Sequence, residues 1–397
     1  MKKIQLFILN CLIIALSSCD SFLDIVPDDI ATIDNAFTMR AQAEKYLFTC
    51  YYYLPAHGLL EANPAIAGGD ELYITESFRS AAHVHAWYIS HNMQSSARPR
   101  CDYWTGADQQ NNKSLYQGIS DCNIFLENIQ KVPDMTQAEK DRWAAEVRFL
   151  KVYYHYWLIR MYGPIPIMDR NIPVNASEDE VKVFRSTIDE CFDYVINSLT
   201  EIINSNHLPD KIMNEAEELG RITQGIAMAI KAEVMVTAAS PLFNPTNDRN
   251  LWHRAAVANK ELIDNCVAAN MSLINDYSAL WSATSHRTAL SELIFGRRAT
   301  RTTNSFEGYN FPVGLENCNG GNCPTQTLVD AYEMQATGLR PDETNGYDPA
   351  QPYYEGRDPR FYLTIAKNGD ENWPSWNDTP LPVSYTHLRA HETELHL

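Results

Sequence analysis

Aromatic, arginine and aspartate side chains gather in two loop-rich segments of the sequence, and such side chains suit the binding of a sugar. Aromatic rings can cover the C–H faces of a sugar, while charged and amide groups can bond its hydroxyls. The same rings could instead pack the loops onto a scaffold, and the sequence leaves both interpretations open. We expect the ligand contacts to come from Asp70, Arg79, Trp87, Tyr88, Arg98, Tyr103 and Trp104 in the first segment, and from Tyr309 and Asn310, beside Phe311, in the second.

Other site chemistries find less support in the sequence. The histidines at positions 83, 85 and 91 have no carboxylate or cysteine at a spacing typical of a metal site, so we expect them to face solvent. The motifs of serine hydrolases, zinc proteases and phosphate-binding loops are absent. With 50 Asp and Glu residues, a glycosidase carboxylate pair stays open as an alternative. We therefore expect a binding protein without cofactor or metal, not an enzyme.

The N-terminus has the pattern of an export signal. Lys2 and Lys3 precede an apolar run that is shorter than the ~20 residues of a membrane-spanning helix. The run ends in Leu16-Ser-Ser-Cys19, which resembles the bacterial lipobox, where cleavage leaves a lipidated cysteine. We expect residues 1–18 to be a signal peptide, Cys19 to carry the lipid, and residues 19–34 to form a tether. The protein would then be anchored on a membrane without crossing it.

Charge and cysteine content narrow the possible partners and crosslinks. A net charge of -18 argues against nucleic acid, whose phosphates would repel the chain. Cys122, Cys191 and Cys266 fall on helical apolar stripes, so we expect them to be buried thiols. Cys318 and Cys323 flank a glycine-containing loop, and a disulfide between them is possible in an exported protein. The sequence does not decide whether these two cysteines pair.

Apolar residues recur every three or four positions through the middle of the chain, which predicts amphipathic helices. One helix should run from about Leu115 to Ile129. The next should open at the capping box Thr136-x-x-Glu139 and stop at Gly163-Pro164, because glycine tolerates the left-handed cap and proline prevents continuation.

Four more helices are expected around that pair. One, capped by Asp34, should run through Leu54 with Ala41 and Phe48 on its apolar stripe, and another should open at Ser177-x-x-Glu180 with a stripe from Val181 and Phe184 to Ile202. A slim, alanine-rich helix should cover about 221–239. The last, about 251–267, should turn Trp252, Ala255, Leu262, Ile263 and Cys266 inward.

Helix pairs that each expose an apolar stripe must stack to bury it, which is the basis of an α-solenoid. We therefore expect a mainly α fold of tetratricopeptide-like helical hairpins with irregular, loop-rich lobes. The helical scaffold should cover residues 35–285, with a loop insertion at 55–111. Residues 286–382 should form a loop-rich C-terminal region.

Several stretches, taken together, resemble the SusD/RagB family of outer-membrane lipoproteins. They include Met161-Tyr-Gly-Pro-Ile-Pro, Gly220-Arg-Ile-Thr-Gln-Gly and Arg357-Asp-Pro-Arg-Phe. They follow one another in the order of the family and span most of the chain. The full set covers residues 19–27, 120–126, 146–157, 161–166, 220–225, 238–244, 324–334 and 357–361.

This resemblance implies a SusD-like helical scaffold whose loops bind an oligosaccharide or, in some members, a peptide. It also implies a surface location on the outer membrane and a partner, a SusC-like TonB-dependent β-barrel transporter that receives the ligand. A purely structural lipoprotein that only holds a protein partner remains the third alternative. Family members usually continue well beyond the region of 357–361, and residues 383–397 look like translated adaptor sequence. We therefore expect an incomplete C-terminal region and a non-native tail.

Overall fold

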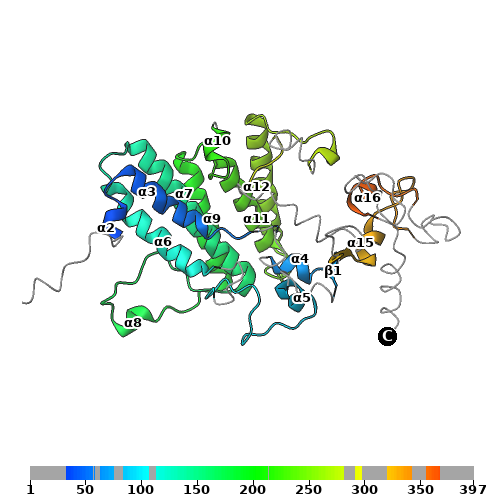
Figure 1. The fold of residues 1–397 in the computed structure, drawn as a ribbon, viewed down its shortest axis with the longest axis horizontal. Coiled ribbons are helices and arrows are strands. Elements are labelled where there is room, and N and C mark those ends of the chain that lie inside the picture. The colour runs from blue at the N-terminus through cyan, green and yellow to red at the C-terminus, as the bar shows by residue number, and fades with distance from the viewer. Residues whose placement is uncertain are drawn as a thin grey trace, which may run out of the picture.

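A row of helices forms the body of the protein, and short elements branch from it (Figure 1). The computed structural model describes residues 33–56, 58, 63–75, 84–106, 113–212, 214–280, 291–296, 320–341 and 355–366. The helices of the body are α2 (Ile33–Ala36), α3 (Arg40–Tyr52), α6 (Leu115–Asn128), α7 (Gln137–Tyr162), α9 (Ile188–Ser205), α11 (Gln224–Ala239) and α12 (Arg249–Ala268).

These helices pack largely in chain order, so that each buries the apolar stripe of the one before it. α3 packs on α6 and α7, α7 on α9, α9 on α11 and α11 on α12. α7 is central, and almost every residue from Trp143 to Ile159 on it is buried. Alanines keep α11 slim where it meets its neighbours, as expected for closely packed helices. The mainly α fold predicted from the sequence is confirmed.

The helix boundaries at α6 and α7 also confirm the sequence prediction. The Thr136 hydroxyl accepts from the Glu139 amide while the Glu139 carboxylate accepts from the Thr136 amide, which completes the predicted capping box. At the other end Gly163 has a φ of 70°, a backbone conformation that glycine adopts without a Cβ clash. The rod that carries most of the core therefore begins and ends at the predicted residues.

The predicted start at Ser177 is wrong, whereas the later part of that helix forms as α9. The Ser177 capping box forms, but it caps only the single turn α8 (Glu178–Val181), and the chain then leaves the helical conformation. A second capping box, Thr187-x-x-Glu190, opens α9. Phe184, assigned to the apolar stripe, is 82% exposed. The sequence contains two capping boxes ten residues apart, and either could begin the helix. The second one does, because the apolar residues that follow it are those that pack into the body.

Two predicted apolar stripes were only partly right. The N-terminal helix is split into α2 and α3, and α3 buries Ala43, Leu47 and Cys50 while Phe48 stays half exposed. On α12 only Ala255 and Ala258 are buried, and Trp252, predicted to be core, is 40% exposed. α12 ends the row of helices, so one face meets α11. Leu262 is half-buried against the core as predicted, whereas Ile263 is exposed.

Shorter elements branch from the body. They are α4 (Pro64–Gly68), β1 (Leu72–Ile74), α5 (Val84–Ser90), the 3-10 turns η2 (Ile129–Lys131) and η3 (Tyr277–Leu280), α10 (Glu215–Glu218), β2 (Asn322–Pro324), α15 (Gln326–Ala331) and α16 (Phe361–Thr364). β1 and β2 pair antiparallel, with Tyr73 opposite Cys323. This pairing joins the segment after α3 to the C-terminal elements (Figure 1). Val329, Phe361 and Ile365 form a separate small core under α15 and α16.

Candidate functional site

The predicted ligand contacts that lie within the described residues all belong to one segment, residues 63–75 and 84–106, which we call the first lobe. They fall in two places on it. The lobe leaves the body after α3 and returns at the start of α6. Its return is fixed by hydrogen bonds, since the Ser114 hydroxyl donates to the Trp104 carbonyl at 2.8 Å and the Leu115 amide donates to the Tyr103 carbonyl at 2.8 Å. Asp102 accepts the amides of Trp104 and Thr105, both at 3.0 Å. These bonds give the end of the lobe one defined conformation.

The first place is the outer part of the lobe, around α5. Trp87 is buried and stacks on the His91 ring with a centroid separation of 4.1 Å. Tyr88 is half-buried, and the Arg100 guanidinium lies 4.0 Å from its ring centroid. Asp70 and Arg98 are exposed nearby in the chain. Trp87 thus packs the lobe, while Tyr88 offers a ring with a stacked cation.

The second place is the junction of the lobe with the body. The Tyr103 ring is buried edge-on against Trp157 of α7, with centroids 5.6 Å apart. Trp104 is half-buried and packs against Tyr116 at 5.0 Å and Tyr162 at 5.4 Å. The exposed Arg185 lies 5.2 Å from the Trp104 ring and donates to the Pro164 carbonyl. Tyr103 therefore belongs to the core, and Trp104 stands at its edge.

Both places share one arrangement that the sequence did not reveal, an arginine against a half-buried ring. Arg100 and Arg185 were not among the predicted contacts. Arg100 lies two residues after Arg98 in the same loop, so its type and place could have indicated it. Arg185 comes from the segment between α8 and α9, and no spacing in the sequence connects it to Trp104. Of the other predicted contacts, Arg79, Tyr309 and Asn310 lie outside the described residues, as do Phe311 and Cys19.

At the junction the phenols are neutral and Arg185 supplies a positive charge. Burial raises the pKa of Tyr162 to about 12, and burial also raises the pKa of Tyr116. The Tyr162 hydroxyl accepts from the Tyr103 amide at 3.0 Å, and the Tyr116 hydroxyl donates to the Pro166 carbonyl at 3.1 Å. Both phenols stay protonated near neutral pH and are held by backbone partners. The surface therefore offers apolar faces and cationic donors.

The described residues offer neither a metal-binding cluster nor a bilayer-spanning helix. Among the described residues, no group of three His, Cys, Asp or Glu side chains is arranged to hold a metal ion. His91 packs on Trp87, and its Nδ1 lies 2.9 Å from the Trp87 carbonyl oxygen. Cys323 has no disulfide partner within the described residues, and Cys318 lies outside them, so their pairing stays a prediction. In the same part of the chain, no helix combines the length and apolar character needed to cross a bilayer.

Known proteins with this sequence pattern and fold are SusD-like. A SusD-like protein of Bacteroides ovatus is 21% identical over 231 residues, which are 51% of this chain and 38% of that protein. A SusD-like protein of Bacteroides fragilis superposes with a TM-score of 0.61 at 22% identity, covering 85% of this chain and 62% of its own. A SusD-like carbohydrate-binding protein of the same organism gives 0.61 at 19% identity, covering 84% and 61%. The chain thus spans less than two thirds of each of these relatives, and the structural likeness shows a shared fold.

Two family models match the chain itself. Residues 291–382 match the SusD family. Residues 22–234 match a SusD-like family described as starch-binding and associating with the outer membrane. Because this second match spans more than half of the chain, the protein belongs to the SusD-like family.

Proposed function

We propose that this protein is a surface lipoprotein that captures oligosaccharides and delivers them to a SusC-type TonB-dependent transporter in the outer membrane. Family membership supports the class of ligand and the membrane. The observation that carries the proposal for this chain is the pairing of half-buried rings with arginines, Tyr88 with Arg100 and Trp104 with Arg185, on a lobe held by the helical body.

Such a pairing can bind a sugar in two ways at once. A ring covers the C–H face of the sugar, and each guanidinium has several N–H donors that can bond ring hydroxyls. The rings are already ordered by packing, so little side-chain entropy is lost on binding. Asp70 and Arg98, which are exposed on the same lobe, can supply further polar contacts. The predicted contacts at Arg79, Tyr309 and Asn310 remain part of the proposal.

We expect Tyr88→Ala and Trp104→Ala each to weaken oligosaccharide binding by roughly 5- to 30-fold, because each removes a half-buried aromatic surface worth about 1–2 kcal/mol. Isothermal titration calorimetry with malto-oligosaccharides, other neutral oligosaccharides and a peptide mixture measures the effect. Trp252→Ala is the matched control, since Trp252 is also half exposed but lies on α12.

The same titrations separate the alternatives. Unchanged affinity in both lobe variants would remove the first lobe from the site. Binding of peptides in place of sugars would favour a peptide-capturing lipoprotein of the same kind of complex. Release of reducing sugar by the purified chain would identify a glycosidase, and absence of all ligand binding with retention of a barrel partner would leave a structural role.

We expect the anchor to be attached through Cys19, because the lipobox places that cysteine at the new N-terminus after cleavage. Cells grown with radiolabelled palmitate should incorporate label into the wild-type chain and none into Cys19→Ala. The variant should leave the membrane fraction, and the TonB-dependent barrel should co-purify with the anchored chain. Label in Cys19→Ala equal to that in the wild type would contradict the anchor.

A further inference from the structure

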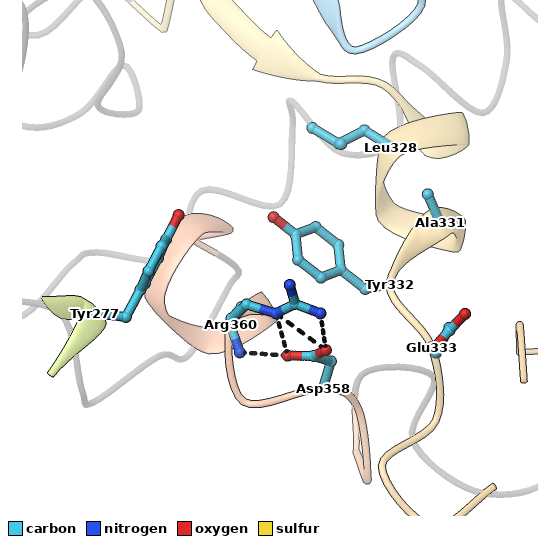
Figure 2. Close-up of a pocket in the computed structure, with 7 residues that line it drawn as sticks. All are labelled: Tyr277, Leu328, Ala331, Tyr332, Glu333, Asp358 and Arg360. Atoms are coloured by element: carbon cyan, nitrogen blue, oxygen red, sulfur yellow. Dashed lines mark hydrogen bonds and ion pairs between the residues drawn. The ribbon is translucent and has the colours of Figure 1, made fainter. Parts of the chain in front are cut away.

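A hollow lies between η3, α15 and α16 (Figure 2). None of its lining residues belongs to the first lobe, although Thr325 at the start of α15 bonds to the Asp70 and Glu71 carbonyls of that lobe. Its volume is about 320 Å³. The rings of Tyr277 and Tyr332 stand on two sides of it, and the Arg360 guanidinium and the Asp358 carboxylate lie below them in the view. Glu333 adds a second carboxylate at the rim. We call this space the Tyr277–Tyr332 hollow.

The polar floor of the hollow is ordered by an ion pair. Arg360 donates from Nη2 to Asp358 Oδ2 at 2.6 Å and from Nε to Asp358 Oδ1 at 3.0 Å. The Arg360 amide donates to the same Oδ1 at 2.8 Å. These bonds lower the pKa of Asp358 and raise that of Arg360, so both groups are charged at neutral pH. The third guanidinium nitrogen, Nη1, is left out of this pairing and is drawn beside the hollow in Figure 2.

The aromatic walls differ in how they are held. Tyr332 is half-buried, packs edge-on against Phe361 with centroids 5.6 Å apart, and lies 2.6 Å by its hydroxyl from the Thr364 hydroxyl. Tyr277, in η3, is 38% exposed. The Asp358 amide donates to the Glu333 carbonyl at 2.8 Å, which ties the segment before α16 to the end of α15. One wall and the floor are therefore held by contacts within the protein.

We propose that the Tyr277–Tyr332 hollow binds one neutral sugar residue, as a second carbohydrate site separate from the first lobe. The volume lies at the lower end of the range for small-molecule sites, which suits a single ring rather than a chain. Two tyrosine faces can cover the C–H surfaces of the sugar, and the ordered Arg360–Asp358 pair offers both donors and acceptors to its hydroxyls.

Charge selects among sugars at this site. One arginine and two carboxylates line the hollow, so its formal charge is negative and the whole chain is acidic at -18. An acidic sugar such as a uronate would meet repulsion from Glu333 and Asp358, and Arg360 is already engaged by Asp358. The proposal depends on the proposed function only for the class of ligand, since none of its residues belongs to the first lobe.

Saturation-transfer NMR tests the site in the full chain. The probes are the methyl glycosides of glucose, galactose and mannose, with glucuronic acid as the charged comparison. The background is the double variant Tyr88→Ala/Trp104→Ala, in which the lobe surface is removed. We expect at least one neutral glycoside to keep its saturation signal in this background, and addition of Tyr277→Ala to reduce that signal at least 5-fold. Tyr277→Phe should restore it, because the ring is kept.

Two outcomes would overturn the sugar site, and a third would overturn its selectivity for neutral sugars. Absence of any glycoside signal in the lobe double variant, or a signal that Tyr277→Ala leaves unchanged, would overturn the hollow as a sugar site. Equal signals from glucuronic acid would overturn its neutral selectivity. Tyr277 is exposed, so its replacement is not expected to unfold the chain, and the same measurements in the wild-type background with Arg360→Gln provide a second test. Loss of oligosaccharide binding in the lobe variants tests the proposed function. It does not change the outcome of the test of the Tyr277–Tyr332 hollow.

Discussion

Replacing Arg221 by methionine is expected to lower the free energy of unfolding by about 3–5 kcal/mol, because it leaves a buried carboxylate without its main partner. Glu146 of α7 is fully buried and accepts from Arg221 Nη2 at 2.8 Å and Nε at 3.0 Å. The Tyr51 hydroxyl donates to the same carboxylate at 2.7 Å, and its oxygen accepts from the Ile222 amide at 3.0 Å. The pair thus connects α3, α7 and the segment before α11.

The pKa shifts of the pair follow from this position. Burial raises the pKa of Glu146, and the Arg221 charge and the Tyr51 hydroxyl oppose that rise. Burial acts to lower the pKa of Arg221, but the Glu146 charge outweighs it, so the pKa of Arg221 is raised. The close bidentate contact keeps both groups ionised in the folded protein. Arg142 also donates from Nε to Glu146 at 3.1 Å, so removal of Arg221 takes away the bidentate partner and leaves the buried carboxylate with Arg142 and the Tyr51 hydroxyl.

Urea denaturation of the wild type and three variants, Arg221→Met, its control and a double variant, measures the effect. Arg160→Met is the matched control, since Arg160 pairs with Glu233 at 3.2 Å but both side chains are partly exposed, and about 0–1 kcal/mol is expected. The double variant Glu146→Leu/Arg221→Met should recover much of the loss, because it removes both charges. A cost for Arg221→Met no larger than that for Arg160→Met would show that the buried pair does not stabilise the body.

The stretches that carried the family resemblance turn out to encode the scaffold. Glu146 and Arg221 come from two of those stretches, 75 residues apart, and meet as one buried ion pair. Arg357, in a third stretch, is buried beside Phe361 and donates to the Val329 carbonyl. Sequence motifs of this kind identify a fold well because residues that contact each other in the core restrict which side chains each position can hold. They say much less about the ligand, which meets the loops.

Local rules predicted some boundaries and failed at others for identifiable reasons. α7 was predicted to the residue because a capping box, a continuous apolar stripe and a Gly-Pro stop agree. The start of α9 was missed because Ser177 and Thr187 both satisfy the capping rule, and only packing against α7 and α11 decides between them. The exposure of Trp252 was missed because periodicity identifies an apolar face without showing whether another helix covers it.

The sequence indicated which types of residue could form the candidate site, but not which individual side chains are exposed. The sequence indicated the loop segment correctly as a place rich in rings and charges, but it could not distinguish Trp87 and Tyr103, which pack the lobe, from Tyr88 and Trp104, which keep exposed area. Irregular segments have no period from which burial can be read. The stacking of Arg185 on Trp104 depends on tertiary structure and has no local signal.

Acidification from pH 6.5 to pH 4 is expected to destabilise the protein through a single histidine on α7. His155 is fully buried, and its Nε2 accepts from the Met168 amide at 3.1 Å while Nδ1 lies 2.8 Å from the Lys151 carbonyl oxygen. Acceptance at Nε2 requires the neutral imidazole. Burial lowers the pKa of His155 to about 4, helped by the Lys151 charge and opposed by Asp169 and the Lys151 carbonyl.

The sign of the effect follows from this lowered pKa. The unfolded chain, with an ordinary histidine pKa of about 6.5, binds the proton more readily than the folded chain does. The contribution is therefore complete above about pH 6.5 and is lost progressively as the pH falls to about 4. A shift of this size corresponds to about 3 kcal/mol.

Urea titrations at several pH values should show a steeper loss of stability in the wild type than in His155→Gln, whose amide can donate to Lys151 and accept from Met168 without titrating. Carboxylates with a lowered pKa that do not interact with His155, such as Glu139, act in both proteins and cancel in the difference. His253→Gln, on the exposed face of α12, is the control for removal of a histidine. Parallel curves for wild type and His155→Gln would mean that the pKa of His155 is the same in the folded and unfolded chains, which would contradict the prediction.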